Sequence, residues 1–280
     1  MTTIGILHPG AMGSSVGAAA SSRGAHVLWC SRGRSIETER RARADGLVAT
    51  ETLEELVASS EVIVSVCPPA SALDVAERVA QARFRGLFVD ANAVSPATAR
   101  AIAAVLGASG AELVDGGIVG PPARAGRKTL LYLSGERASE VVPLFQGSPL
   151  EPRIVGRHVG QASALKMAFA AWTKGSSALL IAVRALAEAE GVSDALLDAW
   201  ATLMPDLTQR SEQAALGALP KAWRWTGEML EISATFESAG LPGGFHRSAA
   251  EVYARLEPFK VERSSLEAIL RALLSEAPSR

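Results

Sequence analysis

Short apolar runs alternate with alanine-rich amphipathic stretches between Thr3 and Val155. The runs have the length and the β-branched or aromatic content of buried strands. They are Thr3–Leu7, His26–Cys30, Val62–Val66, Leu87–Asp90, Ala111–Asp115, Leu130–Ser134 and Pro152–Gly156. Strands that alternate with helices predict a mostly parallel, doubly wound α/β sheet with crossover helices.

After the last of these strands, only helical periodicity remains. It predicts helices over residues 162–190, 194–203, 207–217, 221–239, 248–256 and 265–275. We expect Gly191 to end the first helix and Ser193 to cap the second. Ser264 and Glu267 should form a capping box at the last one. The chain is thus expected to have an α/β domain over residues 1–156 and an all-helical domain over residues 157–280.

The first predicted helix is unusually apolar. Its segment Ala178–Ala187 is hydrophobic on nearly every side except at Arg184. A helix of this kind needs packing partners around most of its circumference. A second copy of the chain could supply some of them, so we expect a homodimer built through the helical domain.

Composition narrows the class of ligand. The 280 residues are 48% hydrophobic and carry a formal net charge of −1, which leaves no excess charge to attract nucleic acid or an anionic membrane. We therefore expect a small-molecule substrate. Cys30 and Cys67 lie inside apolar runs, so we expect no disulfide and no metal site. Without a leader or a long apolar span in the sequence, a cytoplasmic protein is expected.

A glycine-containing turn follows the first strand and precedes a helix of small residues. This context is the one that a dinucleotide-binding fingerprint requires. Gly10 would admit the pyrophosphate, and Gly13 would let the helix pack closely on the strand. His8 stands where the first glycine belongs, and we expect it to be a loop histidine without a chemical role. The predicted cofactor loop is His8, Pro9, Gly10, Ala11, Met12 and Gly13.

This loop predicts a Rossmann domain over residues 1–156, with an ordinary strand-to-helix turn as the alternative. The end of the second strand sets the choice of cofactor, because an acidic residue there would bind the ribose hydroxyls of NAD. Ser31, Arg32 and Arg34 occupy that place instead. Their donors and positive charge suit a 2′-phosphate, so we predict NADP(H), unless these arginines are merely solvated.

Five motifs in this order resemble the β-hydroxyacid dehydrogenase superfamily, which includes 3-hydroxyisobutyrate and 6-phosphogluconate dehydrogenases and, more distantly, imine reductases. The resemblance covers almost the whole chain. It comprises the glycine-rich loop, a strand end that lines the cofactor site, and a segment that begins with Asp and ends with Pro. The last two motifs are the substrate loop and the segment that carries the catalytic lysine. These motifs are Pro9–Gly13, Ser65–Pro69, Asp90–Pro96, Asp115–Pro122 and Gly160–Lys166.

The resemblance implies that Lys166 is the catalytic general acid and base. An amino group in that place could hold or take the proton of a substrate hydroxyl. The resemblance also places cofactor contacts at Cys67 and Pro68. It makes Asn92, Gly120 and Pro121 the residues that face the nicotinamide or the substrate.

Several positions depart from the family pattern. Asn92 and Val119 stand where the family has serines, and Ala170 replaces an asparagine four residues after the lysine. Gly227–Glu228 occupies the place of a Lys-Asp pair. These changes resemble a divergent branch of 6-phosphogluconate dehydrogenase-like proteins with its own C-terminal domain type.

Helical spacing suggests replacements for the missing polar groups. At 100° per residue, Thr173 falls within about 20° of Lys166 on the same helix face. Lys174 is about 80° away and could attract an acidic substrate. Both are predicted substrate-binding residues, with solvated helix positions as the alternative.

The predicted function is that of an NADP(H)-dependent oxidoreductase that interconverts a small hydroxy acid, or another alcohol, and its carbonyl form. The retained Lys166 favours carbonyl chemistry. Imine reduction is one alternative. The others are a non-catalytic NADPH-binding protein and a helical interaction module on a Rossmann-like fold without a cofactor.

Overall fold

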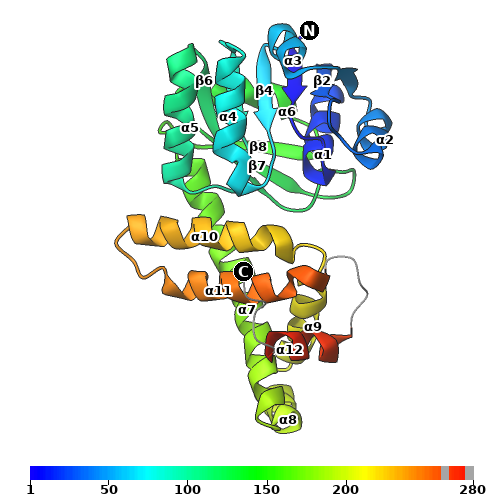
Figure 1. Ribbon diagram of the computed structural model, residues 1–280, viewed down its shortest axis with the longest axis vertical. Coiled ribbons are helices and arrows are strands. Elements are labelled where there is room, and N and C mark those ends of the chain that lie inside the picture. The colour runs from blue at the N-terminus through cyan, green and yellow to red at the C-terminus, as the bar shows by residue number, and fades with distance from the viewer. Residues whose placement is uncertain (260–264, 275–280) are drawn as a thin grey trace. The chain divides into compact units, whose positions relative to one another are not determined.

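The computed structural model describes residues 1–259 and 265–274 (Figure 1). Its eight-stranded sheet has the order β3-β2-β1-β4-β5-β6-β7-β8. β6 and β7 pair antiparallel, and the other neighbouring strands of this sheet pair parallel. The strands are β1 (Thr3–Ile6), β2 (His26–Cys30), β3 (Val48–Thr50), β4 (Val62–Ser65), β5 (Leu87–Asp90), β6 (Glu112–Val119), β7 (Thr129–Ser134) and β8 (Leu150–Gly156).

Helices cover both faces of the sheet. Because successive strand side chains point to opposite faces, Trp29 of β2 packs in one core cluster, with Val16 and Phe145, and Leu28 in another, with Leu106. This two-sided core confirms the doubly wound α/β class. The helices are α1 (Ala11–Ser21), α2 (Ile36–Ala44), α3 (Leu53–Ser59), the 3₁₀ helix η1 (Pro69–Ser71), α4 (Ala72–Gln81), α5 (Pro96–Ser109) and α6 (Ala138–Phe145).

The rest of the described chain is helical, which confirms an all-α C-terminal region. None of the described helices is long and apolar enough to span a membrane. The helices are α7 (Gln161–Ala189), α8 (Ser193–Leu203), α9 (Leu207–Ala218), α10 (Ala222–Ser238), α11 (Gly244–Leu256), the 3₁₀ helix η2 (Glu257–Phe259) and α12 (Leu266–Leu274).

The chain forms two compact units, Met1–Met167 and Ala168–Arg280. The first holds the sheet and the second is helical. The sheet ends at Gly156, but the first two turns of α7 belong to the same unit as the sheet. Domain limits at residues 156 and 157 remain a prediction.

Of the predicted helix ends and caps, one is confirmed and one is wrong. Gly191 has a left-handed φ of 68° just after α7, as expected of a helix end. The N-cap prediction for Ser193 is wrong, because α8 begins at Ser193 and the Ser193 hydroxyl donates to Glu188 at 2.9 Å. Ser264 lies outside the described residues. Ser265 caps α12, its hydroxyl accepting from the amide of Ala268 at 3.2 Å.

Two strands differ most from the sequence-based expectation, and β8 also begins two residues earlier than predicted, at Leu150. β3 was not predicted, because its three residues include exposed Val48 and Ala49 and show no apolar run. β6 continues four residues past Asp115, through the glycine pair Gly116–Gly117, because β7 supplies antiparallel partners as far as Val119.

Candidate functional site

The loop between β1 and α1 has the geometry of a phosphate-binding turn. A Cβ atom on Gly13 would collide with the carbonyl oxygen of His8, so this close packing requires a glycine. No atom lies within 4 Å of a Cβ built on Gly10, so the space beside Gly10 is open. The first-turn amides of α1 have no acceptor within the helix, and a helix N-terminus favours an anion. The loop therefore fits a pyrophosphate.

His8 is compatible with this turn although it replaces a glycine. Among the described residues, Arg83 is the only non-glycine with a positive φ. His8 therefore has an ordinary backbone conformation, and Pro9 continues the turn. The amide of Gly10 donates to the carbonyl of His8 at 2.8 Å, which tightens it further.

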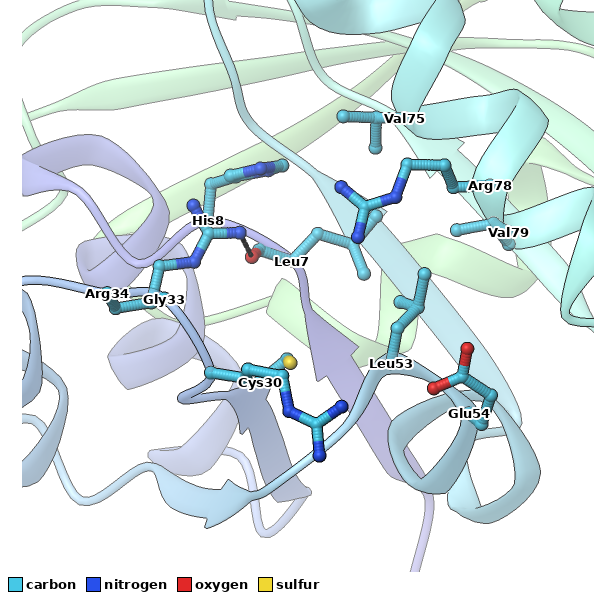
Figure 2. Close-up of a pocket in the computed structure, with 11 residues that line it drawn as sticks. Leu7, His8, Cys30, Gly33, Arg34, Leu53, Glu54, Val75, Arg78 and Val79 are labelled. Atoms are coloured by element: carbon cyan, nitrogen blue, oxygen red, sulfur yellow. Dashed lines mark hydrogen bonds between the residues drawn. The ribbon is translucent and has the colours of Figure 1, made fainter.

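A pocket of about 370 Å³ opens beside this loop (Figure 2). Its apolar lining comes from Leu7, which directly follows β1, and from α3 and α4, and its charged lining includes three arginines and one carboxylate. The lining residues are Leu7, His8, Cys30, Arg32, Gly33, Arg34, Leu53, Glu54, Val75, Arg78 and Val79. Of the predicted phosphate-binding residues, Arg32 and Arg34 border this pocket. Ser31 does not, and its hydroxyl donates to the carbonyl of Thr50 at 2.9 Å.

His8 is neutral in this pocket near pH 7. Burial, followed by the nearby charges of Arg34 and Arg78, lowers the pKa of His8 to about 4. The Nδ1 atom is buried and has no hydrogen-bond partner among the described residues. Arg34 donates from Nη2 to the carbonyl of Leu7 at 3.3 Å, which holds its guanidinium beside the imidazole (Figure 2).

The ends of β4 and β5 are joined by the side chain of Asn92. Its Oδ1 accepts from the amide of Cys67 at 2.5 Å, and its Nδ2 donates to Ser65 Oγ at 3.2 Å and to Asp90. The side chain is 2% exposed. Asn92 thus fixes the backbone that enters Cys67 and Pro68, and its substrate contact remains a prediction.

Cys67 is a protonated thiol in this setting. Burial is the main cause that raises the pKa of the thiol to about 12. The hydrogen bond with Ser65 lowers the pKa and the carboxylate of Asp90 raises it, both by less than burial does. A thiol that stays protonated is a poor nucleophile. Pro68 follows directly and precedes η1, so Cys67 and Pro68 together form the turn at the end of β4.

Asp115 of β6 caps helix α7. Its buried carboxylate accepts from the amides of Gly160 and Ser163 at 2.9 and 3.0 Å, and from Ser163 Oγ at 2.5 Å. Ser134 Oγ donates to it at 2.8 Å. A carboxylate at a helix N-terminus satisfies unpaired amides and complements the helix dipole. The sequence placed Asp115 in a segment that resembles a substrate loop, and this capping role was not predicted.

Lys166 lies one turn further along α7, against the same strand. Its Nζ donates to the carbonyl of Ile118 at 2.7 Å. A Cβ on Gly117 would lie 2.9 Å from the carbonyl oxygen of Ala162 and 3.0 Å from the Cβ of Lys166. The missing side chain at Gly117 therefore lets α7 approach β6 closely enough for the lysine to bond to the strand.

The loop after β6 is fixed at both its ends. Gly120 adopts a φ of 127°, and the carbonyl of Pro121 accepts from Thr129 Oγ1 at 2.7 Å. The amide of Ala123 donates to Ser15 Oγ of α1 at 3.0 Å. The segment from Gly120 to Ala123 therefore has a defined conformation beside the cofactor loop.

An ion pair holds the same loop to α1 and α2. Arg124 binds Asp45 through two bonds of 2.6 and 2.8 Å, and Ser14 donates to the same carboxylate. Burial raises the pKa of Asp45, but the bonds from Arg124 and Ser14 outweigh it and lower the pKa below its ordinary value. Asp45 is therefore ionised and anchors the loop at neutral pH.

The two remaining substrate predictions lie in the helical unit. Lys174 forms an ion pair with Glu228, and its ammonium lies 5.6 Å from the ring centre of Trp225. The hydroxyl of Tyr253 donates to the carbonyl of Lys174 at 2.7 Å. Thr173 is exposed, and its hydroxyl donates to the carbonyl of Phe169 at 3.1 Å. Their substrate contacts remain predictions.

The structure therefore brings His8 of the cofactor loop, Arg32 and Arg34 to one pocket, and Cys67, Pro68 and Asn92 to one turn. Arg78 of α4 also borders the pocket, and no sequence pattern predicted it there. No group of three His, Cys, Asp or Glu side chains that could hold a metal ion occurs within residues 1–259 and 265–274.

Proteins that are similar to the chain include one uncharacterised relative and several solved structures. An uncharacterised 28.5 kDa protein from Methanothermus fervidus is 35% identical over 173 residues, which are 61% of this chain and 66% of that protein. The match thus spans slightly less than two thirds of the relative. MTH1747, a conserved protein of unknown function described as similar in structure to 3-hydroxyacid dehydrogenases, is 26% identical, with a TM-score of 0.65 over 93% of this chain and 100% of that one.

The 3-hydroxyisobutyrate dehydrogenase of Mycobacterium tuberculosis, solved with L-serine, shares the fold. Its TM-score is 0.71 over 98% of this chain and 100% of that one, at 18% identity. Residues 187–256 match a domain of unknown function, DUF1932. Residues 3–146, half of the chain, match the NAD binding domain of 6-phosphogluconate dehydrogenase. The chain therefore belongs to the family of proteins built on the NAD binding domain of 6-phosphogluconate dehydrogenase.

Proposed function

We propose that the protein is an NADP(H)-dependent oxidoreductase that interconverts a small hydroxy acid, or another alcohol, and its carbonyl form. Lys166 is the general acid and base of the reaction. The observation that carries this proposal is the bond from Lys166 to the carbonyl of Ile118, which fixes the direction of an amino group at the end of a glycine-lined strand.

The cofactor loop supports the binding of a dinucleotide. The open space at Gly10 and the close packing at Gly13 fit the two glycine roles that a pyrophosphate site requires. Arg32 and Arg34 border the adjacent pocket, which favours a phosphorylated ribose. Cys67 and Pro68 line the path toward the reacting end of the cofactor. A bound nicotinamide supplies or accepts the hydride.

Lys166 handles the proton that accompanies this hydride. In reduction, its ammonium donates a hydrogen bond to the carbonyl oxygen, stabilises the negative charge that develops there and then gives up a proton. In oxidation, the neutral amine takes the proton of the hydroxyl group. The amino group of Lys166 donates one hydrogen bond to the carbonyl of Ile118. Because this bond is kept, the amino group has the same orientation in both steps.

The substrate would meet the fixed loop at Gly120 and Pro121. Asn92 orients the neighbouring turn, and its own amide is the next candidate for a substrate contact. Thr173 and Lys174 remain proposed substrate-binding residues of the helical unit. Lys174 could meet an acidic substrate only by sharing or exchanging its partner Glu228.

We also propose a homodimer formed through the helical unit. Phe169, Trp172, Leu179 and Leu186 of α7 are 49%, 69%, 50% and 61% exposed. Their spacing of three and seven residues is that of a coiled-coil seam, which suits a second copy of the same helix. We call these four residues the α7 seam. We also propose a cytoplasmic enzyme. The balanced net charge of the chain supports an enzyme that binds neither nucleic acid nor an anionic membrane.

Replacing Lys166 tests the catalytic role. Lys166→Ala should lower kcat about 10³-fold on whichever hydroxy acid or carbonyl compound gives turnover in a substrate panel. The affinities for NADPH and NADH, measured by calorimetry, should change less than about twofold. Lys221→Ala, an exposed lysine of the helical unit, is the matched control and should leave kcat unchanged. Full turnover by Lys166→Ala would rule out the proposed role.

The same assays separate the alternatives. Val119 and Ala170 are buried apolar residues where related enzymes have polar groups, which favours either a different substrate class or no catalysis. Turnover of cyclic imines in preference to carbonyl compounds would identify an imine reductase. Tight NADPH binding with no turnover on either panel would identify a non-catalytic NADPH-binding protein.

A further inference from the structure

The pocket beside the cofactor loop has an excess of positive charge. Arg32 and Arg34 come from the loop after β2, and Arg78 comes from α4. Among the described residues that line the pocket, Glu54 is the only carboxylate. An NAD site would have an acidic residue directly after β2 to accept the ribose hydroxyls, and this chain has Ser31 there. The excess charge favours an anionic ligand group.

Arg78 projects into the pocket because of its place on α4. The neighbouring side chains Val75 and Val79 are buried in the core on one side of the helix. Arg78 lies between them at the mouth, and its guanidinium extends toward Leu7 and Arg34 (Figure 2). Burial is the main cause that lowers the pKa of His8, and the charges of Arg34 and Arg78 lower it further.

His8 provides an unsatisfied polar atom at the same place. Its buried Nδ1 lacks a partner among the described residues. An unpaired buried polar atom is unfavourable, so a ligand group that pairs with it is stabilised. A phosphate oxygen could accept from an imidazole N–H and from guanidinium groups at once.

We propose that Arg78 is a specificity-determining residue that, with Arg34 and His8, binds the phosphate on the adenosine ribose of the cofactor. This inference rests on the proposed NADP(H) function and adds a third element, α4, to the phosphate subsite. The apolar lining from Leu53, Val75 and Val79 takes the adenine ring. An arginine could instead stack on that ring, and the two roles differ in their dependence on the phosphate.

The test uses the full chain and four ligands, measured by calorimetry at one salt concentration. NADPH and 2′,5′-ADP carry the ribose phosphate, whereas NADH and ADP lack it. Arg78→Gln should weaken the binding of the first pair at least about tenfold and that of the second pair less than about twofold. Arg78 is exposed at the surface, so the variant should keep the melting temperature of the wild type.

A matched control removes the same charge elsewhere. Arg85 is exposed and lies two residues before β5, at the amino ends of the parallel strands, whereas the pocket lies at their carboxyl ends. Arg85→Gln should bind all four ligands like the wild type, and Arg34→Gln should behave like Arg78→Gln.

Two results would overturn the inference. Equal weakening of all four ligands by Arg78→Gln would mean that Arg78 stacks on the adenine. Unchanged binding of all four would mean that it does not reach the ligand. If the wild type binds none of the four, the proposed oxidoreductase function fails instead, so the two failures are distinguishable.

Discussion

The two units of the molecule differ in what they leave unsatisfied. In the sheet-bearing unit, buried polar groups such as Asp115 and Asn92 have several partners, and most large apolar side chains are buried. The helical unit contains most of the exposed large apolar side chains of the described chain, including the α7 seam. The first unit has a pocket lined by charged side chains and open to a ligand. The second unit has a stripe of exposed apolar side chains that no described residue covers.

This difference indicates that the two units bind different kinds of partner. A polar pocket with an apolar floor is completed by a small molecule, whereas an apolar helix face is completed by another protein surface. The cofactor is thus expected to stabilise the sheet-bearing unit, and self-association the helical unit. Three further predictions test whether this division holds.

The largest effect is expected from removing the charge that holds α7 to the sheet. In Asp115→Asn, an amide NH₂ group would face hydrogen-bond donors that now face a carboxylate. The free energy of unfolding should therefore fall by about 2–4 kcal/mol. Urea unfolding followed by circular dichroism would measure it. Because Lys166 lies on the next turn of α7, kcat should fall at least about tenfold while KM changes little.

A smaller change at the same cap provides the control. Ser163→Ala removes one of the donors to Asp115 and should cost about 1 kcal/mol. If Asp115→Asn were no more destabilising than Ser163→Ala, the contrast between a polar network in one unit and an apolar face in the other would lose its main support.

The second effect is expected at the α7 seam. Leu179→Asp places a charge in the proposed dimer interface and should weaken dimerisation at least about 100-fold, equivalent to about 2.7 kcal/mol. Analytical ultracentrifugation over a range of micromolar concentrations would measure the dissociation constant. Leu216→Asp is the matched control, since Leu216 of α9 is also 50% exposed. A wild type that is monomeric throughout this range would contradict the dimer proposal.

The smallest effect concerns pH and His8. The pKa of His8 is about 4 in the folded chain against 6.5 in the unfolded one, so the unfolded chain binds more protons between these values. Stability should therefore fall as pH drops from 7 toward 4, and His8 should contribute about 1–3 kcal/mol of that loss. His8→Asn cannot titrate and should lose less stability between pH 7 and pH 5 in urea unfolding.

A phosphate in the pocket would reverse this preference. Saturating 2′,5′-ADP should reduce the pH dependence of the wild type toward that of His8→Asn, because a nearby anion favours the imidazolium form. Identical pH profiles for the two proteins without ligand would show that His8 is not the group responsible.

The sequence predicted the helices and most strands because their signals are local. The bounds of α8 and α9 follow from apolar periodicity and agree with prediction to within one residue. β3 was missed because an exposed three-residue edge strand has no such signal. The extension of β6 was missed because Gly116–Gly117 resembles a loop until β7 pairs with it.

The site was predictable where its residues follow one another in the chain. The cofactor loop and the arginines after β2 are of this kind. Arg78 and the capping role of Asp115 were missed because each depends on a contact between distant segments. Asp115 meets Gly160 across 45 residues, and nothing in either segment alone predicts that meeting.

The glycine fingerprint usually has a glycine both at the turn after the strand and where the helix packs on it. In this chain, Gly13 meets the packing requirement, and His8 takes the place of the glycine at the turn. The collision that any Cβ at Gly13 would cause makes that position intolerant of substitution, whereas His8 shows that the turn itself does not need a glycine. A search pattern that requires glycine at both positions would overlook chains of this kind. A pattern that fixes only the helix-packing glycine would recover them, and it would leave the first position free to acquire side chains that select the ligand.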